Sequence, residues 1–318
     1  MSSLPLVIVN PASANGATGR RWPGLASDLR THFGAFATAF TKQAGDGLLI
    51  AAREAKAGRE LIVACGGDGT INEVASGILE SGADAELGIL PSGTGGDFRR
   101  TLEISNNAAD AARTLRTGRT RRIDIGRVAF TDQRSEQSSR YFIGVASFGI
   151  SGEVIRRVKT NAATPNSLAS SLNRFGGKVS FAVATLGATL AQSATNVWIK
   201  IDEEPERRFT VANFCIANAR YFGGSMKIAP EAKLNDGRFD VVVINELGAS
   251  DTLLNAPKLY LGAHLGMRQV RHTLARRVVA RPAKDDDEVL IEVDGELPGR
   301  LPATFEILPL ALRVRCRA

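Results

Sequence analysis

The sequence predicts an α/β protein of two domains, and three observations support that prediction. Apolar runs without alternation, typical of parallel strands buried on both faces, alternate with helical periodicities up to about residue 130. From Tyr141 onward the pattern changes to successive strands, which suits an antiparallel sandwich. A last strand pattern, Leu310–Arg315, ends the chain of 318 residues. We expect an α/β domain over residues 1–130, a β-sandwich over 131–300, and a C-terminal strand within 301–318 that returns to the first domain.

The stretch Leu61–Glu80 predicts a strand, a glycine turn and a helix in direct succession. Leu61–Cys65 is apolar throughout, and the small residues of Gly66–Gly69 let a backbone pass close to a ligand. The T-x-x-E spacing of Thr70 and Glu73 predicts a capping box at the helix start. N–H groups and the helix dipole would point at the turn, so the stretch predicts an anion site. A simple tight turn is the alternative.

Asp68 lies between these glycines, where its carboxylate would repel a bare phosphate. The residue becomes compatible with a phosphate site if a metal ion or a protonated donor network intervenes. The pattern is neither G-x-x-x-x-G-K-[ST] nor G-x-G-x-x-G, so neither of these two common phosphate-binding fingerprints is met.

Further loops of small polar residues follow other predicted strands. Asn10–Gly16 follows the strand Leu6–Val9, and Pro91–Phe98 follows the strand Leu87–Leu90. Open α/β sheets place their ligands at the carboxyl ends of the strands, so we expect the loops Gly66–Gly69 and Pro91–Phe98 to face each other across one ligand, while Asn10–Gly16 reads as a strand-to-helix loop. Thr41 also ends a strand, and it either contacts this ligand or only enters the next helix.

Apolar periodicity sets the remaining expected elements. In the first part we expect further strands at Ala35–Thr41 and Thr120–Val128, and helices at Trp22–Leu29, Leu48–Gly58, Asp97–Leu102 and Asn106–Gly118. In the second part we expect a hairpin loop over Thr131–Arg140, a polar segment over residues 161–176, a helix at Lys178–Ala191, and strands at Tyr141–Ala146, Asn196–Ile201, Arg208–Ala217, Phe239–Ile244, Val270–Val279 and Val289–Val293.

Composition limits the classes of partner. Lys and Arg number 40 against 33 Asp and Glu, and the net charge of +7 favours an anionic partner such as a nucleotide, a nucleic acid or an acidic membrane surface. The sequence contains no aromatic-basic RNA motif, so we expect no nucleic-acid partner. The longest uncharged apolar stretches fall short of the ~18 residues that span a bilayer.

Cysteine usage and the N-terminal residues bear on the compartment. The three cysteines are far apart and form no zinc pattern with the three histidines. Met1–Pro5 carries no basic segment of a signal peptide. We expect a cytoplasmic protein that attaches peripherally to anionic membranes, and a homodimer is compatible with the sequence.

Several motifs carry a resemblance to a known family. The run GGDGT of Gly66–Thr70, followed by INE, resembles the nucleotide loop of the diacylglycerol kinase catalytic-domain family. The loop Pro91–Phe98 resembles the Pro-x-Gly-Thr-x-Asn-Asp-Phe motif of this family, with Gly96 in place of Asn. Phe142–Gly149 resembles Phe-x-Asn-x-Ala-Ser-x-Gly, with Gly144 in place of Asn. GGDGT is shared more distantly with NAD kinases and 6-phosphofructokinases, so the resemblance implies a nucleotide-binding domain of that type ahead of a lipid-binding β-sandwich.

The resemblance also implies binding residues. The turn Pro230–Gly237 resembles the magnesium turn of the family, which implies Mg²⁺ ligation by the Asp236 carboxylate and the carbonyls of Lys233 and Arg238. Ten residues are implied to contact the nucleotide: Asn10, Thr41, Gly66, Gly67, Asp68, Gly69, Thr70, Ile71, Asn72 and Thr94.

Two residues are implied to be catalytic. Val293–Glu296 contains the Asp-Gly-Glu of the family, whose Glu takes the proton from the lipid hydroxyl, so Glu296 is implied as the general base. Asp68 is implied as the second catalytic residue, joined to the magnesium turn through Asp97 and Asp124. An ordinary hairpin remains the alternative for the Asp-Gly-Glu segment.

Together these implications describe an ATP-dependent lipid kinase that uses Mg²⁺ and transfers the γ-phosphate to a lipid hydroxyl. One alternative is an NAD kinase-like enzyme. The other is a non-catalytic nucleotide- or lipid-binding relative, and the substitutions at Gly96 and Gly144 favour this second alternative. Diacylglycerol, a sphingoid base and phosphatidylglycerol all offer a free hydroxyl, so the sequence leaves the lipid open.

Overall fold

The computed structural model describes residues 4–93, 95–162, 194–245 and 249–317. Thr94, the polar segment from residue 163 onward and the expected helix Lys178–Ala191 lie outside the described residues. The chain forms two compact units. The first comprises residues 1–125, 234–237 and 308–318, and the second comprises residues 126–233 and 238–307.

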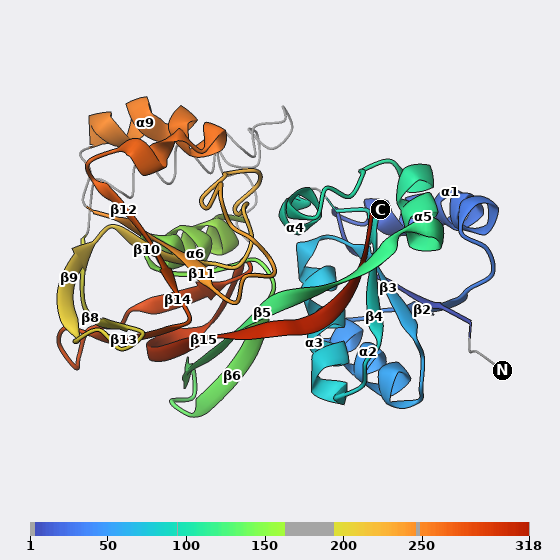
Figure 1. Ribbon diagram of the computed structural model, residues 1–318, viewed down its shortest axis with the longest axis horizontal. Helices are drawn as coiled ribbons and strands as arrows, with labels where there is room; N and C mark the ends of the chain where they lie inside the picture. Colours follow the sequence, from blue (N-terminus) through green and yellow to red (C-terminus); the bar gives the residue numbers. More distant parts are fainter. Residues whose placement is uncertain (1–3, 94, 163–193, 246–248, 318) are drawn as a thin grey trace. The chain divides into compact units, whose positions relative to one another are not determined.

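The first unit is a parallel sheet with helices on both faces. Figure 1 shows α2 and α3 against one face of this sheet and α1 and α5 against the other. The strands pair in the order β2-β1-β3-β4-β15, all in parallel. The elements are β1 (Leu6–Val9), α1 (Ala17–His32), β2 (Ala37–Phe40), α2 (Asp46–Lys56), β3 (Leu61–Gly66), α3 (Asp68–Ser81), β4 (Glu86–Pro91), α4 (Asp97–Thr101), α5 (Ala108–Thr117) and the ends of β5 (Arg119–Asp132) and β15 (Glu296–Cys316).

Burial explains why these strands read as unbroken apolar runs. Every residue of β1, β3 and β4 is buried, because helices cover both faces of the central strands. The edge strand β2 instead alternates between half-buried and exposed positions. The predicted fold class, an α/β domain followed by a β-sandwich domain, is confirmed.

The C-terminal segment completes the first sheet. β15 ends beside β4, with Arg313 paired to Glu86 and Val314 paired to Leu87. The Arg315 Nε atom donates to Glu86 Oε1 at 2.9 Å, and Thr120 Oγ1 donates to the same oxygen at 2.7 Å. Burial raises the pKa of Glu86, but these hydrogen bonds outweigh burial and hold the pKa below its usual value.

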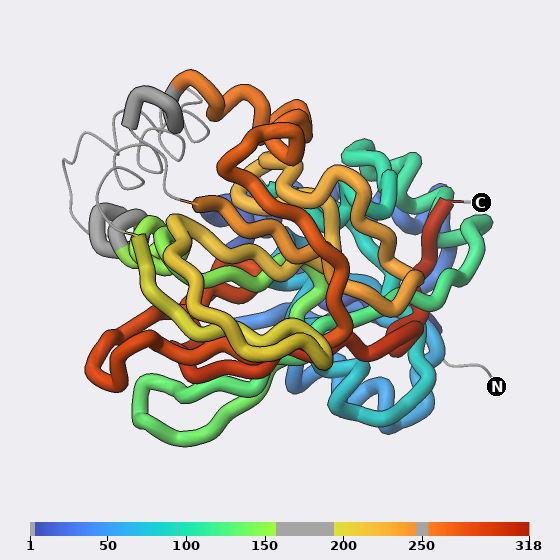
Figure 2. The backbone as a smooth tube through the Cα atoms, turned by 60° about the vertical axis from the view of Figure 1, so that its left-hand side comes forward, coloured from blue at the N-terminus to red at the C-terminus, as the bar shows by residue number. Residues whose placement is uncertain are grey.

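The second unit is an antiparallel sandwich. One run of paired strands is β12-β11-β10-β7-β14, and the other is β9-β8-β13-β15. The hairpin β14–β15 joins the two runs. β5 and β6 form a second hairpin and β8 and β9 a third, green and yellow in Figure 2. The elements are β6 (Gln137–Phe142), β7 (Val145–Gly149), α6 (Ile150–Ala162), β8 (Thr195–Ile201), β9 (Arg207–Val211), β10 (Asn213–Ala217), β11 (Phe239–Ile244), α9 (Ala249–Leu261), η1 (Ala263–Gly266), β12 (Val270–Ala275), β13 (Arg277–Pro282) and β14 (Leu290–Val293).

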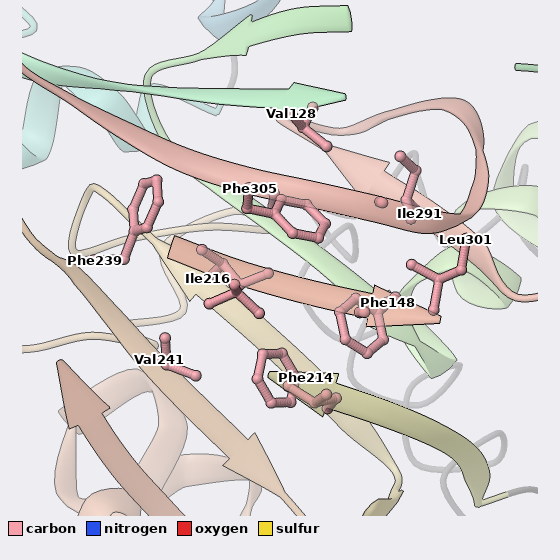
Figure 3. Close-up of a cluster of buried hydrophobic side chains, with 14 of the residues drawn as sticks. Val128, Phe148, Phe214, Ile216, Phe239, Val241, Ile291, Leu301 and Phe305 are labelled. Atoms are coloured by element: carbon pink, nitrogen blue, oxygen red, sulfur yellow. The ribbon is translucent and has the colours of Figure 1, made fainter. Parts of the chain in front are cut away.

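Aromatic and branched side chains from both runs fill the sandwich, and Figure 3 shows them pointing toward one another. The rings of Phe148 and Phe214 stack with centroids 4.9 Å apart, and Phe305 lies 6.3 Å from Phe148. Such stacked pairs add to the stabilisation that burial of the rings provides.

Two segments of the second unit that were predicted as single strands each form two strands. Val270–Val279 divides into β12 and β13 at Arg276, because β12 pairs with β11 while β13 pairs with β15 and β8. Arg208–Ala217 divides at Ala212 in the same way, and the Ala212 N–H donates to the Ile244 carbonyl. Both segments keep a strand pattern throughout, so the change of partner leaves no signal in the sequence.

Other boundaries in this unit also differ from prediction. The predicted hairpin at Thr131–Arg140 is present as the connection of β5 and β6, but its loop is shorter than predicted, since Thr131 already pairs with Gln137. The predicted strand Tyr141–Ala146 is broken between Phe142 and Val145. The helices α6 and α9 were not predicted. None of the described helices combines the length and hydropathy that a membrane span requires.

Arg315→Met should lower the free energy of unfolding by ~3–5 kcal/mol, because it leaves the buried Glu86 carboxylate without its ionic partner. Urea denaturation of the variant and the wild type at pH 7 measures this difference. The pKa of Glu86 in the folded protein lies below its usual value of 4.5. The ionised carboxylate therefore stabilises the fold above pH 4.5, and this stabilisation is lost as pH falls through the lowered pKa, so the difference between the two proteins should shrink in acid.

Arg313→Met is the matched control, because its partner Asp84 is largely exposed. The control should cost less than ~1 kcal/mol. Equal losses in the two variants would contradict a buried ion pair at Glu86.

Candidate active site

Three loops of the first unit follow the carboxyl ends of β1, β3 and β4, and hydrogen bonds join them. Asn10 Nδ2, at the end of β1, donates to Thr70 Oγ1 in the first turn of α3 at 3.1 Å. Asn10 Oδ1 accepts from the N–H of Ala12, which fixes the turn after β1. Ser92 N, after β4, donates to the Gly66 carbonyl at 3.0 Å. The sequence-predicted loops therefore come together at one edge of the sheet.

Two of these loops touch through glycine backbone. A Cβ atom placed on Gly93 would lie 2.3 Å from Gly67 Cα and 3.0 Å from Gly67 N, so only glycine fits there. A Cβ on Gly66 would lie 2.4 Å from Thr70 Oγ1. The close approach explains why both loops are built from glycine and other small residues.

Asp68 ties the β3–α3 loop to the β4–α4 loop. Its carboxylate accepts backbone N–H groups from Gly96 at 2.8 Å, Asp97 at 3.1 Å and Phe98 at 3.1 Å. These N–H groups open the short helix α4, so a side chain of one loop caps the helix that follows the other. A carboxylate engaged in this way fixes the relative position of the two loops.

The predicted capping box of Thr70 and Glu73 is wrong. Helix α3 begins at Asp68 with Gly67 as its N-cap, and Thr70 already lies inside its first turn. The Glu73 carboxylate instead accepts N–H groups from Gly45 at 2.8 Å and Gly47 at 3.0 Å, at the start of α2. Local spacing suggested a bond within one helix, but tertiary packing offered Glu73 two donors from a neighbouring one.

The remaining implied nucleotide contacts differ in what they can offer. Ile71 is 1% exposed and its N–H donates to the Gly67 carbonyl, so its side chain belongs to the core. Asn72 Oδ1 accepts from Ser76 Oγ at 3.3 Å, and Gly69 is exposed. Thr41 is buried and its N–H donates to the Val9 carbonyl.

The loop after Thr41 is held by another carboxylate. Asp46 Oδ2 accepts N–H groups from Lys42 at 2.7 Å and Gln43 at 3.1 Å. These two backbone donors hold the pKa of Asp46 below its usual range. The side chain therefore remains ionised and keeps the loop in place at neutral pH.

Leu234–Gly237, the part of the predicted magnesium turn that carries Asp236, belongs to the first unit, whereas Lys233 and Arg238 on either side of it belong to the second. Buried Asp124 accepts N–H groups from Gly237 and Leu310, each at 2.7 Å, and its own N–H donates to the Leu234 carbonyl. This bonding explains how a fully buried carboxylate is satisfied. It also places the exposed Asp236 on a fixed turn.

The donor set of this turn suits a hard cation. Asp236 offers a carboxylate, and its exposed neighbours Lys233 and Arg238 offer backbone carbonyls. Across the described residues no group of three or more His, Cys, Asp or Glu side chains is arranged around a common metal position.

The Asp-Gly-Glu segment lies in the second unit as the tight turn between β14 and β15. Val293 pairs with Glu296 across the turn, and Asp294 and Gly295 have φ of 47° and 84°, as in a type I′ turn. The Asp294 carboxylate accepts N–H groups from Ile143, Gly144 and Val145 at 2.9, 2.9 and 3.0 Å. Glu296 is exposed at the first position of β15, so the segment is a hairpin that presents a carboxylate.

The two glycines that replace Asn of the family motifs differ in their surroundings. Gly96 has φ of 70° and ψ of 36°, a left-handed conformation that Gly and Asn adopt more readily than other residues. A Cβ on Gly144 would lie 2.5 Å from Asp294 Oδ1, so glycine gives this carboxylate room. Gly96 therefore keeps the loop conformation and loses only a side-chain amide.

Sequence reasoning missed several supporting residues. Thr18 Oγ1, on α1, donates to the Ser92 carbonyl at 2.9 Å and so ties the β4–α4 loop to α1. Arg100 Nη1 donates to the Gly95 carbonyl at 2.6 Å and to Asp97 Oδ1 at 2.8 Å. No pattern in the sequence marks Thr18, whereas the i, i+3 spacing of Asp97 and Arg100 is a visible signal.

Comparisons with known proteins match both parts of the chain. Residues 5–128 match the family described as the diacylglycerol kinase catalytic domain, and residues 144–316 match the YegS C-terminal NAD kinase beta sandwich-like domain. The chain is 30% identical over 266 residues to the diacylglycerol kinase of Bacillus subtilis strain 168, covering 83% of this chain and 80% of that protein. It is 28% identical over 304 residues to the diacylglycerol kinase of Staphylococcus saprophyticus, covering 94% and 90%. The fold matches a crystal structure of a diacylglycerol kinase from Bacillus anthracis strain Sterne with a TM-score of 0.76 at 23% identity, covering 99% and 97%.

Asp68→Ala should loosen the β4–α4 loop, because three N–H groups lose their common acceptor. We expect a loss of ~1–3 kcal/mol in the free energy of unfolding, and faster hydrogen exchange at the amides of residues 96–98. Asp68→Asn keeps one carbonyl acceptor and should lie between wild type and Asp68→Ala. Urea denaturation and hydrogen exchange by mass spectrometry measure both effects.

The control is Asp110→Ala, which removes an exposed ion pair with Arg113 on α5. It should leave exchange at residues 96–98 unchanged. Unchanged exchange there in Asp68→Ala would mean that Asp68 does not hold the loop.

Proposed function

The chain belongs to the diacylglycerol kinase catalytic-domain family, and from that premise we propose that it is an ATP-dependent lipid kinase. The proposal is supported above all by the pairing of two glycine loops through Asp68 at the carboxyl edge of a parallel sheet. This is where open α/β sheets hold their ligands. The Asp-Gly-Glu hairpin of the second unit supplies the carboxylate that such a reaction needs.

The phosphates of ATP would lie against the β3–α3 loop. Gly67 caps α3 without a side chain, so no side chain at this position competes with a phosphate for the first N–H groups of the helix. The positive end of the helix dipole favours an anion at the same place. Gly66, Gly69 and Thr70 border this loop, and Asn10 is held against it through Thr70.

Mg²⁺ would be held by the Asp236 carboxylate with the carbonyls of Lys233 and Arg238. When bound, the ion neutralises charge on the phosphate oxygens. Asp124 holds the turn from below through Gly237, which fixes the direction of the Asp236 backbone.

Glu296 would act as the general base. Its carboxylate accepts the proton of the lipid hydroxyl while the hydroxyl oxygen bonds to the γ-phosphorus and the bond to the leaving ADP oxygen breaks. The residue is exposed, and the Asp294 carboxylate fixes the turn that carries it through three hydrogen bonds. This arrangement positions a proton acceptor without burying it.

We propose that the second unit binds the lipid and that the enzyme acts at the surface of an anionic membrane. The net charge of +7 supports the second point, since exposed cations attract acidic headgroups. The candidate acceptors are diacylglycerol, sphingoid bases and phosphatidylglycerol, each of which has a free hydroxyl.

The direct test is γ-labelled ATP with Mg²⁺ and vesicles that each contain one candidate lipid, followed by identification of the labelled product. Labelled phosphate in one lipid is the expected result. NAD without lipid is the parallel reaction for an NAD kinase. Labelled NADP instead of lipid, or no transfer to any acceptor, would contradict the proposal. Sedimentation with the same vesicles at low and high salt should show binding that salt weakens.

Glu296→Gln should lower the rate of the chemical step by ~10²–10⁴-fold, since the amide cannot accept the proton. The apparent affinity for ATP should barely change, because the glycine loops are untouched. Single-turnover rates at saturating lipid measure the step. Glu288→Gln, at another exposed position of the second unit, is the control. A fall of less than about tenfold would favour a hairpin without a catalytic role.

Asp236→Asn should raise the Mg²⁺ concentration for half-maximal rate by about tenfold or more, since one anionic ligand is lost. ATP binding measured without Mg²⁺ should stay as in wild type. Asp110→Asn, an exposed carboxylate on α5, controls for the loss of one negative charge. Collapse of ATP binding with an unchanged Mg²⁺ response would refute the assignment of Asp236.

A further inference from the structure

A second carboxylate, Glu292, contacts the Asp-Gly-Glu turn from inside the sandwich. It lies on β14, is 4% exposed, and pairs with Ser147 of β7. Glu292 Oε1 accepts the Gly295 N–H at 2.6 Å, and Oε2 is hydrogen-bonded to Ser147 Oγ. The carboxylate therefore bonds directly to the central residue of the turn that presents Glu296.

The contacts continue from Glu292 to α6 through buried polar groups. Ser147 Oγ and Ser151 Oγ lie 2.8 Å apart, and Ser151 is in the first turn of α6. The Ser151 N–H donates to Asn213 Oδ1 at 3.2 Å, and Asn213 Nδ2 contacts Cys215 Sγ at 3.1 Å. These groups connect β14, β7, α6 and β10 within one unit.

Burial makes this carboxylate sensitive to pH near neutrality. Desolvation raises the pKa of Glu292 to about 7, opposed by the hydrogen bonds from Ser147 and Gly295 and assisted by the charge of Asp294. On β10 the facing titratable group is Cys215, whose thiol burial and Glu292 keep protonated. α6 carries the more exposed ion pair of Glu153 and Arg156.

The two protonation states differ in the strength of their hydrogen bonds. The ionised carboxylate accepts strongly from the Gly295 N–H, because charge-assisted hydrogen bonds are the stronger kind. The protonated acid is a weaker acceptor for both of its donors, the Gly295 N–H and the Ser147 hydroxyl. Protonation therefore weakens the bond that holds the turn.

We propose that Glu292 is a positioning residue that holds the Asp294–Gly295–Glu296 turn when ionised and loosens it when protonated. The effect on catalysis rests on the proposed function of Glu296, whereas the effect on the turn does not. The turn should accordingly be best ordered on the alkaline side of neutrality and loosen as pH falls through this range.

The first experiment follows the Gly295 amide by nuclear magnetic resonance. Carbonyl-¹³C aspartate with ¹⁵N glycine selects glycines that follow aspartate, which in this chain are Gly47, Gly69, Gly237 and Gly295. In wild type one of these amides should titrate with a midpoint near pH 7. Glu292→Gln should abolish that titration, and the exposed Glu288→Gln should preserve it.

Ser147→Ala gives an independent test should Glu292→Gln fail to fold. Ser147 stabilises the ionised form, so its loss should move the midpoint of the Gly295 titration to higher pH. A Gly295 amide that titrates alike in wild type, Glu292→Gln and Ser147→Ala overturns the proposal.

The second experiment measures lipid phosphorylation against pH. Wild-type kcat should fall as pH drops through 7, and Glu292→Gln should be roughly 10- to 100-fold slower at pH 8 and flat across this range, with an unchanged KM for ATP. Matching pH profiles of kcat in wild type and Glu292→Gln overturn the catalytic part. Absence of activity in wild type on every lipid contradicts the proposed function instead, and the Gly295 titration still decides whether Glu292 controls the turn.

Discussion

The first unit depends on the three hydrogen bonds that the Asp68 carboxylate accepts from the start of α4. They draw the β3–α3 and β4–α4 loops together until Gly67 and Gly93 touch through backbone atoms. Where the two loops touch, the contact is made by glycine backbone. In the proposed function a phosphate would approach the N–H groups of the β3–α3 loop, while the Asp68 carboxylate is bound to N–H groups of the β4–α4 loop.

Buried or half-buried carboxylates hold turns throughout the molecule by the same means. Glu73 fixes the start of α2, Asp124 fixes the turn Leu234–Gly237, and Asp294 fixes the connection between β6 and β7. In each case a carboxylate accepts backbone N–H groups from a segment distant in sequence. Such bonds are stronger than neutral ones and leave the donor segment little freedom. These turns are therefore held by side chains from other elements as well as by their own backbone bonds.

This pattern divides the acidic residues of the motifs into two groups. Asp68, Asp124 and Asp294 are occupied by backbone N–H groups and act mainly on geometry. Asp236 and Glu296 are exposed on the turns that this first group fixes. In the proposed lipid kinase reaction the first group would position the loops and turns, and the second would meet the metal and the proton.

The sequence by itself determined the fold class, the central strands of the first unit and the loops at their ends. Those features depend on local signals: unbroken apolar runs, glycines after strands and helical periodicity. Only the tertiary structure decided where β12 gives way to β13, which N–H groups Glu73 accepts, and that Leu234–Gly237 joins the first unit. Each of these depends on contacts between residues far apart in the chain. A carboxylate has the same local sequence whether its hydrogen-bond donors come from its own helix or from another element, and so the sequence alone does not reveal them.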